Sequence, residues 1–176
     1  LVVDDNKNLV HIDKFYMSAK PKDVSSNIPE TTAILHKLVD IESRLEWDYY
    51  FITIALLASK RSSCSRLSVG CVITKDNRIL STGYNGFLRG APHISRVIDG
   101  HEQFTVHAEQ NAISDAAYRG ISLKHSVAYV THYPCINCFK LLIAAGIHEI
   151  KYLSDYKNNS LNSKIAKENN IKIIKF

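Results

Sequence analysis

The spacing of apolar residues divides most of the chain into short strands and helices. Apolar residues recur at helical spacing in the stretches 47–58, 107–118, 135–145 and 160–168. Short apolar runs rich in β-branched residues predict strands at 69–74, 78–84, 127–131, 149–153 and 171–176. Asp76-Asn77 supplies a hairpin turn between the first two strands, and Gly120 and Gly146 end two of the helices.

Strands and helices alternate in the later part of the chain. This alternation is typical of parallel strands whose faces are covered by helices, and it indicates an α/β fold. The stretch 85–103 has neither period and contains Gly86, Gly90, Pro92 and Gly100, so it is predicted to be a loop.

The first 45 residues differ in character from the rest. Val2–Val3 and the run 9–12 flank a polar turn and predict strand, turn and strand. Two prolines among several Ser and Asn residues make 19–32 a linker or irregular arm, and 31–45 returns to helical spacing. We therefore expect an N-terminal extension or arm of unknown role at 1–45 and a folded domain at 46–176.

Length and composition narrow the class of protein. The 176 residues are 45% hydrophobic and 22% charged, which fits one soluble domain with a modest extension. These values exclude a fibrous repeat, a wholly disordered chain and a small disulfide scaffold. No apolar run approaches the roughly 18 residues of a membrane span, so no membrane partner is expected. The net charge of +5 favours anionic ligands without choosing among them.

Cysteine usage points to metal or redox chemistry. The cysteines are Cys64, Cys71, Cys135 and Cys138. Residues 1–20 lack the basic start and apolar stretch of a signal peptide, so we expect a cytoplasmic protein in a reducing environment. In that environment a Cys-x-x-Cys pair is more typical of a metal or redox site than of a structural disulfide.

Two short motifs at predicted helix starts carry the chemistry. One is His-Ala-Glu at 107–109, and the other is Pro-Cys-Ile-Asn-Cys at 134–138. The spacing of Cys135 and Cys138 puts both sulfurs on one helical face, at a helix end whose dipole favours thiolate. With His107 they supply three zinc ligands and leave one position open, as in catalytic zinc sites.

Glu109 lies two residues after the histidine, and its expected role is to move protons. A carboxylate beside a zinc-activated water can take a proton and deliver it to the substrate. This His-x-Glu and Pro-Cys-x-x-Cys combination is the signature of zinc deaminases. A lone Cys-x-x-Cys also fits a structural zinc knuckle or a thioredoxin-like pair. A structural site, however, needs a fourth ligand at suitable spacing, and a redox pair needs no His-x-Glu.

Residues from about 47 to 176 resemble the cytidine deaminase superfamily, and within it the deoxycytidylate (dCMP) deaminases. The resemblance rests on Gly-Tyr-Asn-Gly at 83–86, His-Ala-Glu-Gln-Asn-Ala-Ile at 107–113 and Thr-His-Tyr-Pro-Cys at 131–135. It implies an α/β fold in which a three-layer α/β/α sandwich surrounds a five-stranded mixed sheet, and it implies homohexamers. It also implies that His107, Cys135 and Cys138 hold Zn²⁺ and that Glu109 is the proton shuttle.

The same resemblance implies deamination of dCMP to dUMP and ammonia, which supplies dUMP for thymidylate synthesis. Asn85 is the expected contact to the sugar, with a plain Asn-Gly turn as the alternative. The backbone of Ala108 is expected to touch the pyrimidine ring. Arg66 and Tyr156 are the candidates for the phosphate, because a guanidinium fork matches phosphate geometry; each is otherwise a plain surface residue. No nucleic-acid partner is expected.

Two further properties of the family remain open from the sequence. Some relatives carry a second, structural zinc, and Cys64, His93 and His101 lie in the corresponding regions. Ile94 stands where relatives often have a cysteine, so a buried cysteine and loop histidines are the alternative. Family members are commonly activated by dCTP and inhibited by dTTP, with Mg²⁺ accompanying the triphosphate. Leu88 stands where a proline is common in that loop.

Other functions share part of the pattern. Deaminases of tRNA or single-stranded nucleic acid use the same zinc and glutamate, but the segment 155–158 does not reproduce their characteristic sequence well. Free-base, nucleoside and riboflavin-pathway deaminases are further alternatives. A catalytically silent zinc module that binds nucleotides is a different class, and the intact Glu109 argues against it.

Overall fold

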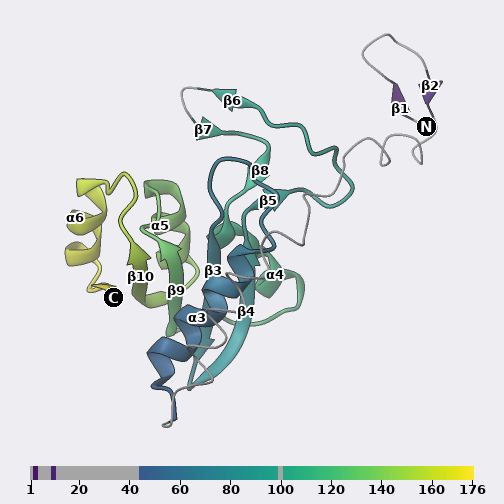
Figure 1. Cartoon of the computed structure of the whole chain (residues 1–176). Helices are drawn as coiled ribbons and strands as arrows, with labels where there is room; N and C mark the ends of the chain where they lie inside the picture. Colours follow the sequence, from purple (N-terminus) through teal and green to yellow (C-terminus); the bar gives the residue numbers. More distant parts are fainter. Residues whose placement is uncertain (1, 4–8, 11–43, 99–100) are drawn as a thin grey trace. The chain divides into compact units, whose positions relative to one another are not determined.

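We describe the protein from a computed structural model that covers residues 2–3, 9–10, 44–98 and 101–176 (Figure 1). The chain divides into two units, Leu1–Arg44 and Leu45–Phe176. In the first unit, β1 (Val2–Val3) pairs antiparallel with β2 (Leu9–Val10), as the apolar pattern predicts. The predicted linker at 19–32 and almost all of the predicted helix at 31–45 lie outside the described residues.

The second unit is built on a five-stranded sheet, in the order β11-β10-β9-β3-β4. Its strands are β3 (Gly70–Lys75), β4 (Arg78–Tyr84), β9 (Ser126–His132), β10 (Ile147–Ser154) and β11 (Lys172–Lys175). The last three strands run parallel, whereas β3 pairs antiparallel with both β4 and β9. The expected mixed sheet and its parallel half are confirmed.

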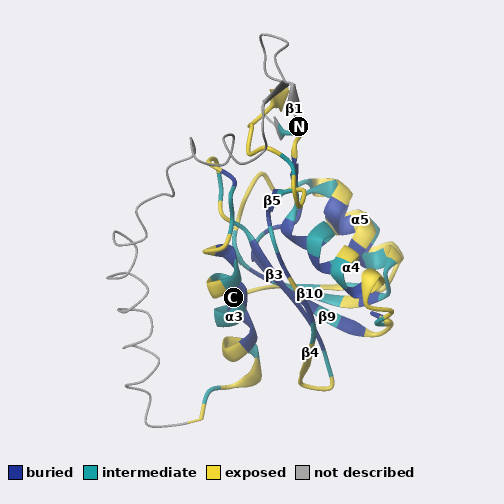
Figure 2. Cartoon of the chain, turned by 90° about the vertical axis from the view of Figure 1, so that its right-hand side faces the viewer, coloured by how far each residue is buried: buried dark blue, intermediate teal, exposed yellow. Residues whose placement is uncertain are grey.

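Helices cover both faces of this sheet (Figures 1 and 2). They are α3 (Trp47–Ser59) on one face and α4 (Ala108–Tyr118), α5 (Ile136–Ala144) and α6 (Ser160–Glu168) on the other. The side chains of β3 point alternately to the two faces of the sheet. Cys71 and Ile73 pack in the core under α4 and α5, whereas Val72 packs with Phe51 of α3 on the other face. The three-layer α/β/α arrangement is therefore also confirmed.

The stretch 85–103 is more structured than its composition predicts. It contains β5 (Gly86–Phe87), β6 (Val97–Ile98) and β7 (His101–Glu102). The strand β5 pairs with β8 (Thr105–Val106), and β6 pairs with β7. Strands of two residues have no detectable period, which is why the pattern of apolar residues misses them. Among the described residues, the helices are too short or too polar to cross a bilayer.

Two glycines let helices lie directly against the sheet. A Cβ on Gly70 would lie 1.9 Å from the Ala55 carbonyl oxygen of α3. A Cβ on Gly83 would lie 2.2 Å from the Ala108 carbonyl oxygen of α4. Backbone atoms cannot swing aside as a flexible side chain does, so a larger residue at either position must displace the helix.

We expect Gly70→Ala to lower the free energy of unfolding by about 1–3 kcal/mol or more, the range for overpacked cores. Gly86→Ala is the control, because its added Cβ first meets the Ser63 hydroxyl, at 3.0 Å, rather than a helix backbone. Urea unfolding of both variants measures the difference. Equal midpoints for the two would contradict the close approach of α3.

Candidate active site

Two helix starts bring the predicted ligands together. His107 immediately precedes α4, and Cys135 immediately precedes α5. Both have extended backbone, with φ −70° and ψ 156° at His107 and φ −65° and ψ 162° at Cys135. The His107 N–H donates to Gln110 Oε1 at 3.1 Å, and the Cys138 N–H donates to Cys135 Sγ at 3.5 Å. The starts of α4 and α5 therefore bring the imidazole of His107 and the sulfurs of Cys135 and Cys138 close together.

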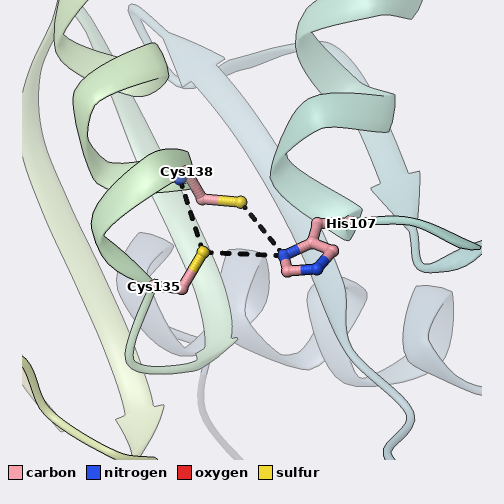
Figure 3. A group of neighbouring side chains, drawn as sticks. All are labelled: His107, Cys135 and Cys138. Carbon is pink, nitrogen blue, oxygen red and sulfur yellow. Dashed lines mark hydrogen bonds between the residues drawn. The ribbon is translucent and has the colours of Figure 1, made fainter. Parts of the chain in front are cut away.

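The three ligand atoms fit one tetrahedral zinc ion. His107 Nδ1 lies 3.6 Å from Cys135 Sγ and 3.3 Å from Cys138 Sγ (Figure 3). Ligands at ordinary Zn–N and Zn–S lengths around a tetrahedral ion are about 3.5 Å apart. All three atoms lie within 4.8 Å of one another. The donor set and its spacing are those of a zinc site with three protein ligands.

Burial and hydrogen bonding shift the pKa values of this group. Hydrogen bonding to the Cys138 side chain lowers the pKa of Cys135 to about 3, while the bond to Cys135 and burial raise the pKa of Cys138. The hydrogen bond to Cys135 raises the pKa of His107. Zinc binding would require both cysteines as thiolates and His107 as a neutral imidazole, so it would release protons from this group.

Glu109 lies in the first turn of α4 and is 4% exposed. Burial raises the pKa of its carboxyl group above the ordinary value. A carboxyl group with a raised pKa holds a proton more readily near neutral pH, which suits a group that must accept and return one.

A cavity of about 360 Å³ opens beside this cluster, large enough for a nucleotide-sized ligand. Its lining includes eight of the eleven site residues predicted from the sequence: Cys64, Arg66, Asn85, His107, Ala108, Glu109, Cys135 and Tyr156. These residues come from the segment before β3, the end of β4, the starts of α4 and α5, and the turn after β10. The structure thus gathers parts that are far apart in the sequence.

Asn85 lines the cavity and also forms hydrogen bonds to the backbone of the segment before β3. Its Oδ1 accepts from the Val69 N–H at 2.8 Å, and its Nδ2 donates to the Leu67 carbonyl oxygen at 2.7 Å. An amide has a second N–H and a second lone pair, so capacity for a ligand remains. Asn85 therefore fixes the segment that follows Arg66, whether or not it touches a ligand.

The residues expected to bind a second zinc do not form a comparable cluster among the described residues. Cys64 is buried at the cavity wall, and the His93 ring stacks on Phe87 with centroids 5.0 Å apart. The side chain of His101 lies outside the described part of the structure. Within that part, only the His107 cluster brings three ligands of this kind together.

Several lining residues were not predicted from the sequence, among them His132, Lys157 and Asn159. His132 ends β9, and its Nδ1 lies 2.9 Å from the Thr131 hydroxyl. Lys157 and Asn159 follow the end of β10. Ligands of α/β sheets bind outside the carboxyl ends of parallel strands, so position after a predicted strand was the available indication.

The fold and the three-ligand site together define a zinc-binding α/β protein with one open ligand position. Comparison with known families is more specific. The family model described as "Cytidine and deoxycytidylate deaminase zinc-binding region" matches residues 45–154, and the chain belongs to this family. The match includes His107, Glu109, Cys135 and Cys138 and ends before α6.

Individual relatives agree with this assignment. The chain is 42% identical over 120 residues to ComE operon protein 2 of Bacillus subtilis (strain 168), covering 66% of this chain and 64% of that protein. It is 31% identical over 146 residues to the deoxycytidylate deaminase of Saccharomyces cerevisiae, covering 76% of this chain and 46% of the relative. The chain thus spans less than two thirds of either relative.

A solved structure is also similar. The dCMP deaminase from the cyanophage S-TIM5, in complex with dCMP and dUMP, aligns with a TM-score of 0.67 and 29% identity. The alignment covers 77% of this chain and 100% of that one.

Proposed function

We propose that this protein is a zinc-dependent enzyme that converts dCMP and water to dUMP and ammonia. The observation that carries the proposal is the buried Glu109 beside the His107, Cys135 and Cys138 cluster, at the wall of a nucleotide-sized cavity. The choice of dCMP is supported by relatives named deoxycytidylate deaminase and by the solved relative that holds dCMP and dUMP.

In this proposal, His107, Cys135 and Cys138 hold Zn²⁺ in the active site. When bound, zinc is a Lewis acid that makes water a nucleophile at neutral pH. Glu109 accepts a proton from the attacking water and delivers it to ring nitrogen N3. A second transfer through the same carboxylate accompanies cleavage of the C4–N bond, and the amino group leaves as ammonia. Glu109 is itself buried, which strengthens its interactions with the reacting atoms.

The remaining lining residues are assigned to the nucleotide. Asn85 contacts the sugar, the Ala108 backbone contacts the pyrimidine edge, and Arg66 and Tyr156 contact the phosphate. All four line the same cavity, which supports these assignments. Lys157, beside Tyr156 on the cavity wall, adds a second positive charge near the proposed phosphate position.

We expect Arg66→Ala to lower kcat/KM for dCMP and to leave competitive inhibition by deoxycytidine, which lacks the phosphate, unchanged. A hydrogen bond to a charged group contributes about 1.5–3 kcal/mol, so kcat/KM for dCMP should fall about 10- to 100-fold. Arg61→Ala is the control, because Arg61 is exposed and outside the cavity lining. An equal loss of dCMP turnover and of deoxycytidine inhibition would remove Arg66 from the phosphate contact.

Further parts of the proposal rest on the family resemblance. We propose a deaminase domain at 46–176, with the extension at 1–45 of unknown role, in a cytoplasmic homohexamer that binds no nucleic acid. We also propose activation by dCTP with Mg²⁺, inhibition by dTTP, and a second zinc held by Cys64, His93 and His101. Light scattering, metal analysis and rates with each triphosphate test these statements separately.

The substrate is tested by ammonia release from dCMP, CMP, deoxycytidine, dCTP and tRNA, each with and without low dCTP or dTTP. The proposal predicts turnover confined to dCMP. Turnover of tRNA or deoxycytidine instead would replace the substrate while keeping the chemistry. No turnover by zinc-loaded protein would favour a silent nucleotide-binding module.

A further inference from the structure

We propose that Asn162 of α6 is a positioning residue for Cys135, acting through the carbonyl group of Pro134. The inference rests on the proposed function in one respect, since it takes His107, Cys135 and Cys138 as zinc ligands. It concerns a residue beyond the end of the family match at residue 154.

The segment before Cys135 is held at two points. The Tyr133 N–H donates to the Ser154 carbonyl oxygen at the end of β10, at 2.8 Å. The Pro134 carbonyl oxygen accepts from Asn162 Nδ2 at 2.9 Å, and Pro134 is less than 2% exposed. Since Pro134 lies ahead of α5, the helix ladder supplies its carbonyl with no partner. Asn162 is the partner that this buried oxygen requires.

Asn162 is an unusual choice for its place in the fold. It is completely buried, on the side of α6 where Ala166 and Ile165 pack into the core. Its Nδ2 has the Pro134 bond, but its Oδ1 is buried with no partner. Packing alone would be met by an apolar side chain without an unpaired oxygen. The amide is therefore explained by the hydrogen bond that it donates.

That hydrogen bond sets the direction of a zinc ligand. The Pro134 carbonyl group and the Cys135 nitrogen belong to one planar peptide unit. A hydrogen bond that fixes the carbonyl oxygen therefore also fixes the orientation of the Cys135 backbone nitrogen. The φ of −65° at Cys135 then places its sulfur 3.6 Å from His107 Nδ1. The neighbouring Asn159 caps α6 through the Leu161 N–H, at 2.9 Å, and lines the cavity. The first turn of α6 thus contacts both the ligand segment and the cavity.

The test is zinc release from Asn162→Leu, which keeps a similar side-chain volume and removes the donor. Loss of a residue that orients a metal ligand typically lowers metal affinity about 10- to 100-fold. We therefore expect release into a chromogenic chelator to be at least about tenfold faster than from the unsubstituted protein. We also expect the thiolate-to-metal absorption of the Co²⁺-loaded variant to change, because the Cys135 sulfur is reoriented.

Two controls on α6 separate positioning from stability. Ala166→Gly weakens the helix without touching Pro134. Asn169→Leu removes an exposed asparagine that also donates to a carbonyl group, that of Ile165, at 2.9 Å. Both should release zinc at the unsubstituted rate and keep the cobalt spectrum. Asn162→Ser, whose shorter side chain cannot reach the Pro134 carbonyl, is measured in parallel. Its zinc release tests the inference if the leucine variant does not fold.

Unchanged release and an unchanged cobalt spectrum in the Asn162 variants would overturn the inference. Equal acceleration by Ala166→Gly would overturn it too, because general loosening of α6 would then suffice. Failure of the proposed function would be seen differently, because the unsubstituted protein would then bind no zinc.

Discussion

We expect Glu109→Gln to abolish the proposed turnover of dCMP while zinc remains bound. Glutamine has nearly the same shape, but its amide cannot accept and return a proton at neutral pH. General acid–base groups contribute about 10²- to 10⁴-fold, and Glu109 serves more than one transfer in the proposed mechanism, so we expect kcat to fall at least about 1,000-fold. Zinc content should not change, because the three proposed metal ligands are other residues. Steady-state kinetics and metal analysis on the same preparation measure both effects.

Asp115→Asn provides the matched control for this change. Asp115 lies on the same helix, where its carboxylate accepts from Ser81 and pairs with Arg119 away from the cavity. It should keep activity near that of the unsubstituted protein. Retention of more than a few per cent of the activity by Glu109→Gln would show that another group moves the proton.

Cys138→Ala removes one of the three proposed zinc ligands and should eliminate both zinc and turnover. Two remaining ligands hold zinc poorly, so we expect the affinity to fall by more than about 100-fold, the upper range for losing a residue that merely orients a ligand. The melting temperature should fall as well, because a metal that binds only the folded state stabilises that state. Metal analysis after dialysis and thermal unfolding provide the measurements.

Cys71→Ala is the appropriate comparison. Both cysteines are completely buried, but Cys71 lies in β3 and packs in the hydrophobic core, outside the ligand cluster. This variant should keep one more equivalent of zinc than Cys138→Ala. Equal zinc content in the two variants would mean that Cys138 is not a ligand.

The sequence predicts the sheet and the metal cluster well because both depend on local patterns. The Asp76-Asn77 turn is one case, since its two residues have φ of 50° and 57°, as a two-residue hairpin turn requires. His107 and Cys135 are another, since each motif fixes a helix start together with its side chain. The strand runs 69–74 and 149–153 also lie within one to two residues of the observed bounds.

The residues that sequence analysis missed depend on tertiary contacts. His132 and Lys157 line the cavity because β9 and β10 are parallel neighbours, which brings the segments after them together. In the sequence, Asn162 cannot be distinguished from other polar helix residues. Its hydrogen bond to the Pro134 carbonyl is visible only in the folded structure. Asn85 was predicted as a ligand contact, and its bonds to Leu67 and Val69 emerge only once β4 lies beside that segment. No periodicity encodes such pairings.

The proposed reaction is best tested by mass spectrometry of the product formed from dCMP in isotopically labelled water. The account predicts dUMP carrying one labelled oxygen at C4 and one ammonia released per dUMP formed. It also predicts that removing zinc stops the reaction and that restoring zinc restarts it. Unchanged dCMP after incubation with folded, zinc-loaded protein would contradict the account, as would dUMP without labelled oxygen.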